Sequence, residues 1–198
     1  MVWSCLVSIL PGMAQTEKLT DYVNPFVGTD GYGNVYPGAQ IPFGGIQISP
    51  DTDSRFYDAA SGYKYNHLTL MGFSLTHLSG TGIPDLGDFL FIPGTGEMKL
   101  EPGTHEDPDQ GYRSRYSHDK EWASPNYYAV ELADYGVKAE MTSGVRSGMF
   151  RFTYPESDNA FIMIDMNHTL WQSCEWSNLR MINDSTITGY KLVKGWGP

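Results

Sequence analysis

The chain has 198 residues, of which 40% are hydrophobic and 14% aromatic; this is enough for a substantial core, in one large domain or two small ones, and excludes a disordered protein. Its formal net charge of −10, without any basic stripe, excludes a nucleic-acid partner. The two cysteines, Cys5 and Cys174, are too few for a disulfide framework, and no zinc-type Cys-x-x-Cys pair is present.

The first fourteen residues are interpreted as the remnant of a signal peptide. An apolar run at 2–10 precedes a small-x-small pattern that ends at Ala14, although no basic segment comes before it. A lipoprotein signal around Cys5 is the alternative. We therefore expect a secreted or periplasmic bacterial protein, lipid-anchored on the second interpretation. No stretch reaches the roughly 18 apolar residues that a transmembrane helix needs.

Short strands are predicted along the rest of the chain. The first half gives strands at 22–27, 46–49, 68–75 and 89–92. The glycine-rich loop at 28–34 lacks the spacing of a dinucleotide or P-loop fingerprint, which excludes a phosphate cradle of those types.

The second half begins with a polar, loop-rich stretch at 94–121 and then gives further strands. Apolar residues alternate at 128–132, 137–142 and 150–154, whereas 161–164 is apolar on both faces and predicts a central buried strand. A weaker strand follows at 186–190. Helical periodicity is sustained nowhere, so residues 15–198 predict one mainly β domain, an antiparallel sandwich. The last residues, 195–198, supply no closing element, and we expect the natural chain to continue.

The stretch 61–93 concentrates polar side chains between two apolar runs. Ser79 lacks the glycine spacing of a nucleophile elbow. Asp85 and Asp88 could form the carboxylate pair of a glycosidase, but aspartates three apart in a turn more often make turn hydrogen bonds. They could also supply part of a calcium site, and His77 could bind a ligand or serve as a structural hydrogen-bonding group. The aromatic rings of Phe56, Tyr57, Tyr63 and Tyr65 nearby could stack on a sugar or pack in the core.

An ordered set of motifs resembles the N-terminal domain of glycoside hydrolase family 92. The matching segments are 23–29, 36–39, 42–44, 49–52, 61–65, 72–82, 85–88, 114–118, 123–128 and 139–142. The resemblance implies a supersandwich-like β-sandwich that precedes an (α/α)6 catalytic barrel. It also implies a calcium-dependent, inverting exo-α-mannosidase similar to α-1,2-mannosidases. The acid, base and calcium ligands are expected on that barrel, which this chain lacks. The chain alone is then expected to be inactive, with no catalytic or metal-binding residue of its own.

The same resemblance implies that loops of this domain contact α-mannosides or related glycans. Phe26 and the pair Ala59 and Ala60 match sugar-pocket positions, and the candidate substrate-binding set is Phe26, Tyr57, Ala59, Ala60, His77, Asp85 and Asp88. Family members have Trp-Asp-Gly-Cys where this chain has Tyr-Asp-Ala-Ala at 57–60, so the pocket differs in shape. The alternative is a stand-alone carbohydrate-binding module, and a third possibility is a structural domain whose partner is the barrel.

Overall fold

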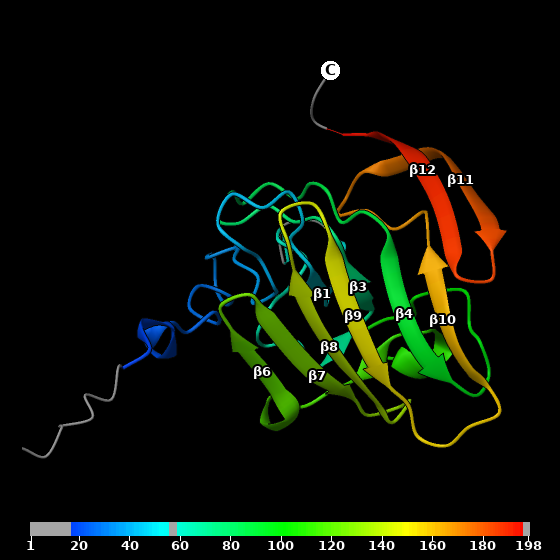
Figure 1. The fold of residues 1–198 in the computed structure, drawn as a ribbon, viewed down its shortest axis with the longest axis horizontal. Helices are drawn as coiled ribbons and strands as arrows, with labels where there is room; N and C mark the ends of the chain where they lie inside the picture. Colours follow the sequence, from blue (N-terminus) through cyan, green and yellow to red (C-terminus); the bar gives the residue numbers. More distant parts are fainter. Residues whose placement is uncertain (1–16, 56–58, 196–198) are drawn as a thin grey trace, which may run out of the picture.

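The structure, a computed structural model, describes residues 17–55 and 59–195 and is built almost entirely of antiparallel β-strands (Figure 1). Its helical segments are three single 3-10 turns, η1 (Leu19–Tyr22), η2 (Pro108–Gln110) and η3 (His118–Lys120). No helical barrel is formed by the described residues, and none of their helices is long and apolar enough to cross a bilayer. The mainly β sandwich predicted from the sequence is confirmed.

One four-stranded sheet is a simple meander. It consists of β6 (Glu121–Ser124), β7 (Tyr127–Leu132), β8 (Val137–Ser143) and β9 (Gly148–Thr153), paired in chain order. The turn before β8 contains Gly136 at φ 64°, a conformation that glycine adopts without steric cost. The register sets Tyr128 opposite Met141 and Val130 opposite Ala139, so these four side chains share one face.

The second four-stranded sheet joins distant parts of the chain. Its order is β1 (Ser49–Asp51), β3 (Gly72–Ser74), β4 (Leu90–Thr95) and β10 (Ala160–Asp165). The strand predicted at 68–75 is divided, because β2 (Thr69–Leu70) pairs instead with β5 (Ser114–Arg115). The segment therefore contributes to two sheets, with Met71 at the break.

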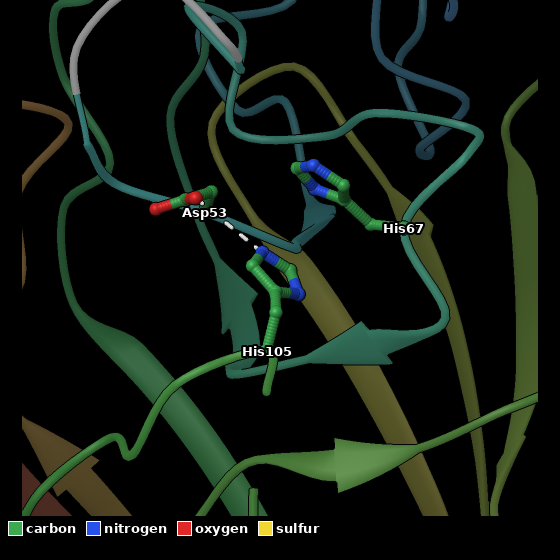
Figure 2. Close-up of side chains that lie close together, drawn as sticks. All are labelled: Asp53, His67 and His105. Atoms are coloured by element: carbon green, nitrogen blue, oxygen red, sulfur yellow. Dashed lines mark ion pairs between the residues drawn. The ribbon is translucent and has the colours of Figure 1, made fainter. Parts of the chain in front are cut away.

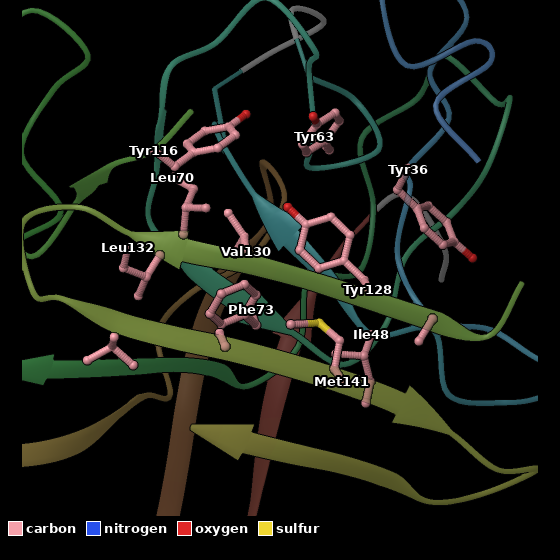
Figure 3. Packing of buried hydrophobic residues seen from close by; sticks show 13 residues of the cluster. Tyr36, Ile48, Tyr63, Leu70, Phe73, Tyr116, Tyr128, Val130, Leu132 and Met141 are labelled. Carbon is pink, nitrogen blue, oxygen red and sulfur yellow. The ribbon is translucent and has the colours of Figure 1, made fainter. Parts of the chain in front are cut away.

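The main core lies between the two four-stranded sheets (Figure 3). Alternate side chains of β7 and β8 pack against Ile48, Leu70 and Phe73 from the opposite side. Phe73 and Val130 have no exposed surface. Full burial of one such side chain contributes about 1.5–3 kcal/mol, so this layer of aromatic and aliphatic groups fixes the sandwich.

A long hairpin projects beyond the two sheets (Figure 1). It is formed by β11 (Ser173–Asn183) and β12 (Thr186–Lys194), which pair only with each other among the described strands. Most of its side chains are exposed. The sequence predicted only the first part of β12, at 186–190, and missed β11, since exposed strands on a hairpin need no buried alternating face.

Two sequence predictions about individual strands are wrong. Residues 22–27 form no strand: Tyr22 ends η1, and a turn begins at Pro25. Asn24 Oδ1 accepts a hydrogen bond from the Phe26 amide, and Pro25 has no amide hydrogen to donate to a sheet. Strand β10 is not central: it pairs only with β4 at the sheet edge, and Ile162 is 52% exposed. An apolar run alone does not distinguish a buried central strand from an edge strand.

Candidate functional site

Four segments meet beside β1 and β3. They are called the rim loops and comprise residues 24–35, the described residues of 52–67 (52–55 and 59–67), 76–88 and 166–172. Backbone amides on these loops donate to carbonyls on their neighbours, from Tyr65 to Thr29 at 2.9 Å, from Gly80 to Asn34 at 2.7 Å and from Leu170 to Leu86 at 2.9 Å. The chain thus brings together the glycine-rich turns and the polar stretch that the sequence singled out.

A buried carboxylate lies beneath the rim loops. Asp51 ends β1, and its two oxygens lie 2.7 Å from Nε2 of His77 and 2.8 Å from Nε2 of His168. All three side chains are at least 96% buried, since their exposed fractions are 0%, 0% and 4%. Burial raises the pKa of the Asp51 carboxyl, but the charges and hydrogen bonds of the two imidazoles outweigh it and hold that pKa well below its usual range.

The loop around Gly62 fits closely over this carboxylate. Gly62 has φ 85°, and a Cβ atom there would lie 2.1 Å from Oδ1 of Asp51 and 3.1 Å from Nε2 of His77. Only glycine permits both the backbone conformation and the approach. The next residue, Tyr63, is buried in the main core.

A second buried carboxylate, Glu121, fixes Tyr63 from the other side. Glu121 Oε1 accepts hydrogen bonds from the hydroxyls of Tyr63 at 3.0 Å and Tyr128 at 2.5 Å, while His118 Nδ1 lies 2.6 Å from Oε2. Burial, together with Tyr116 and Glu121, raises the pKa of the Tyr63 hydroxyl far above its ordinary value. The hydroxyl therefore stays protonated and donates to the carboxylate.

The predicted sugar-pocket residues of the first two rim loops occupy different environments. Phe26 is half-buried and meets the Tyr65 ring edge-on, with 5.7 Å between centroids, and Tyr65 in turn stacks on His118 at 3.9 Å. Ala59 and Ala60 are buried immediately before the Gly62 turn. Tyr57 lies outside the described residues.

The predicted residues of the 76–88 loop have separate partners: His77 contacts residues near β1, whereas Asp85 and Asp88 contact the segment before β11 and β12 itself, respectively. His77 is 2% exposed, and its Nδ1 lies 2.7 Å from the Gln47 carbonyl oxygen. Asp85 accepts a hydrogen bond from the Gln172 amide, whereas Asp88 pairs with Lys191 Nζ at 3.0 Å. The two aspartates thus contact different partners: Asp85 fixes the 76–88 loop to the segment before β11, and Asp88 fixes it to β12.

Three polar residues that define this site were not predicted from the sequence, namely Asp51, Glu121 and His168. Asp51 lies 26 residues from His77 and 117 residues from His168 along the chain. Contacts over such separations leave no local spacing signal. A cluster of Asp53, His67 and His105 was also missed for this reason.

The comparisons with known proteins identify relatives of this chain. Residues 22–198 match the glycosyl hydrolase family 92 N-terminal domain. The chain is 30% identical over 139 residues, 69% of its length, to an uncharacterized secreted glycosidase of Arthroderma benhamiae. The family 92 glycosyl hydrolase ccman5 superposes on 90% of the chain with a TM-score of 0.73 and 29% identity. The family 92 inverting mannosidase BT2199 of Bacteroides thetaiotaomicron superposes on 76% with a TM-score of 0.60 and 27% identity.

All three relatives are much longer than this chain. It spans 17% of the secreted glycosidase, 24% of ccman5 and 20% of the Bacteroides mannosidase.

Proposed function

Because the chain belongs to the N-terminal domain family of glycosyl hydrolase family 92, we propose that it is the β-sandwich part of an exo-α-mannosidase resembling α-1,2-mannosidases. In this proposal the sandwich packs on a separate catalytic domain and lends loops to its sugar pocket. The similarity to a mannosidase at 27% identity supports the substrate class. The chain's small share of each relative supports a catalytic domain elsewhere in the same protein.

The observation that carries the docking part of the proposal is the outer face of the hairpin. The register sets Trp176 opposite Leu192, and Tyr190 lies two residues before Leu192, so these three side chains share one face. Trp176 is 51% exposed, Leu192 57% and Tyr190 58%. The ring centroids of Trp176 and Tyr190 are 4.9 Å apart. Contiguous exposed apolar groups are typical of a surface that another domain covers.

The hairpin is also oriented by a contact on its other face. Lys191, between Tyr190 and Leu192, points the opposite way, with a side chain that is only 3% exposed. Its Nζ contacts Asp88 at 3.0 Å and donates to the His168 carbonyl at 2.6 Å. The apolar outer face is therefore held away from the rim loops and available to a partner.

For the sugar pocket we propose the rim loops, with the residues named from the family resemblance. Phe26, Asp85 and Asp88 are partly exposed, and Ala59, Ala60 and His77 would support the loop backbone from below. Tyr57, which replaces the family's Trp, is proposed to alter the pocket's shape. A small residue at 59 and 60 suits close packing of this loop over the core.

The calcium ion expected from the family is assigned in this proposal to the catalytic domain. Calcium needs six to eight oxygen ligands, and the one three-residue cluster of metal-ligating type found among residues 17–55 and 59–195 contains two histidines. That donor set does not fit calcium. Secretion or periplasmic export is proposed from the 1–14 segment, which lies outside the described residues, and from the secreted relative.

The proposal is tested first with the purified chain. With calcium present it should release no mannose from α-1,2-mannobiose, and calorimetric titration with mannose or mannobiose should show no heat of binding. Release of mannose would contradict the assignment of catalysis to another domain. Measurable binding would favour the carbohydrate-binding module instead.

The second experiment joins the chain to the sequence that follows it in its gene. An open reading frame encoding a helical domain is expected, and the joined protein should hydrolyse α-1,2-mannobiose and lose activity on calcium removal. A stop codon directly after residue 198, or a joined protein that cleaves only other glycosidic linkages, would overturn the proposed function.

A further inference from the structure

Two histidines and an aspartate converge between the rim loops and the 100–111 loop (Figure 2). One ligand atom from each of Asp53, His67 and His105 lies within 4.8 Å of the other two. Asp53 is 4% exposed at its side chain and His105 17%, and the two imidazole rings are 4.1 Å apart. These residues have no part in the buried Asp51 network or in the proposed docking face.

The spacing within the cluster approaches that of a tetrahedral metal site. His105 Nε2 lies 3.3 Å from Oδ2 of Asp53. Ligand atoms around a zinc ion with bonds of about 2.0–2.1 Å are separated by about 3.3 Å. His105 Nε2 is also buried and makes no hydrogen bond of good geometry within the described part of the chain. His67 completes the set, because one of its ligand atoms lies within 4.8 Å of those of both other residues.

Hydroxyl groups orient both rings from outside the cluster. His67 Nδ1 lies 2.9 Å from Thr52 Oγ1, and His105 Nδ1 lies 2.8 Å from Thr69 Oγ1. Metal-ligating histidines typically have their second ring nitrogen fixed in this way. The two threonines are themselves held, since Thr52 Oγ1 accepts from the Lys64 amide and Thr69 Oγ1 accepts from Arg113.

We propose that Asp53, His67 and His105 bind a zinc ion. Two imidazoles and one carboxylate suit a borderline-soft divalent ion and leave a fourth position for water. Asp53 and His67 flank the loop that carries Ala59, Ala60 and Gly62, so the ion would fasten both ends of this loop and tie it to the 100–111 loop. The site differs from the sequence-based expectation of no metal in this chain and does not depend on the proposed mannosidase function.

Arg55 provides an internal test of the proposal. Its guanidinium contacts both oxygens of Asp53, with Nη2 2.9 Å from Oδ2 and Nε 3.1 Å from Oδ1, and would compete with a metal ion for this carboxylate. The Arg55 side chain is 67% exposed. Replacing it by alanine should therefore tighten zinc binding by roughly two- to fivefold, the strength of an exposed ion pair. If Asp53 only pairs with Arg55 and binds no metal ion, the Arg55→Ala variant should show no increase in zinc affinity.

The direct experiment is a calorimetric titration of the purified, chelator-treated protein with zinc chloride. One zinc ion per chain is expected, and His67→Gln and His105→Gln should each weaken binding at least tenfold. His118→Gln is the matched control, because His118 contacts Glu121 outside the cluster and should leave zinc affinity unchanged. Cobalt chloride should give the visible absorption of a tetrahedral ion, and calcium chloride should not compete.

Far-ultraviolet circular dichroism of each variant separates lost binding from lost folding. Zinc should also raise the melting temperature of the unmodified protein and of His118→Gln, but not of His105→Gln. Absence of saturable binding to the folded, unmodified protein would overturn the proposal. Zinc binding that persists in a folded His67→Gln, His105→Gln double variant would do the same.

Discussion

Nε2 of His168 lies 2.8 Å from Oδ2 of Asp51, although 117 residues separate them in the chain. This contact fixes the segment before β11 to the end of β1, beneath the rim loops. His77 occupies the other oxygen of the same carboxylate. One buried charge therefore fixes two rim segments relative to the end of β1.

Asp51→Asn should lower the free energy of unfolding by about 3–5 kcal/mol at pH 7, the usual effect of removing one partner from a buried ion pair. The amide cannot accept from both imidazoles as the carboxylate does. Urea unfolding followed by fluorescence measures the change. Asp109→Asn is the control: Asp109 pairs with Arg115 at the surface, is 72% exposed and should cost at most about 1 kcal/mol. Equal losses in the two variants would contradict a special role for Asp51.

The stability contributed by Asp51 should disappear in acid. Its folded pKa lies below the unfolded value of about 3.9, so the unfolded chain binds a proton first as the pH falls. The contribution is therefore complete above that value and is lost as the pH falls below it. The groups that face the carboxyl are His77 and His168, and Lys191 contacts the His168 carbonyl. The difference in urea midpoint between the unmodified protein and Asp51→Asn should stay constant from pH 6 to about pH 4 and then shrink from about pH 4 to pH 2. A difference that stays constant below pH 4 would refute this.

Gly62→Ala should destabilise the protein by more than about 4 kcal/mol, because the new methyl group would overlap the Asp51 carboxylate in a backbone conformation unfavourable to alanine. Gly80→Ala supplies a matched control. Gly80 also has positive φ, 74°, but nothing lies within 4 Å of its Cβ position, so only the backbone cost of about 1–2 kcal/mol applies. Thermal unfolding of the two variants distinguishes close packing from backbone strain, and similar melting temperatures would exclude the packing explanation.

The sequence was informative where the signal is local. The alternation at 137–142 gave β8 almost to the residue, since one face of that strand carries the buried apolar residues Val137, Ala139 and Met141 and the other carries polar residues. The ordered motifs gave the family, and the match over residues 22–198 confirms it. The exposed strand β11 left no such pattern, and the apolar run of β10 was misinterpreted as central.

The buried polar groups could not be predicted for a different reason. Asp51 follows Pro50 in a motif that suggests a turn, and nothing nearby indicates that two distant histidines will surround it. Likewise, the pairing of Asp53 with His105 depends on how the 100–111 loop packs against the rim loops. Such contacts follow from the assembled sandwich and not from the spacing of residues along the chain.

The apolar outer face of the hairpin gives the last prediction, which rests on the proposed function. The double variant Trp176→Ser, Tyr190→Ser should weaken association of the chain with its separately expressed catalytic domain at least tenfold, since large aromatic groups at the centre of an interface dominate binding. Stability of the isolated chain should change little, because both side chains are about half exposed, at 51% and 58%. Trp122→Ser is the control, as Trp122 is 45% exposed on β6, outside both the hairpin and the rim loops, and should leave association unchanged. Sedimentation analysis of the mixtures measures the affinity, and unchanged association of the double variant would show that the catalytic domain docks elsewhere.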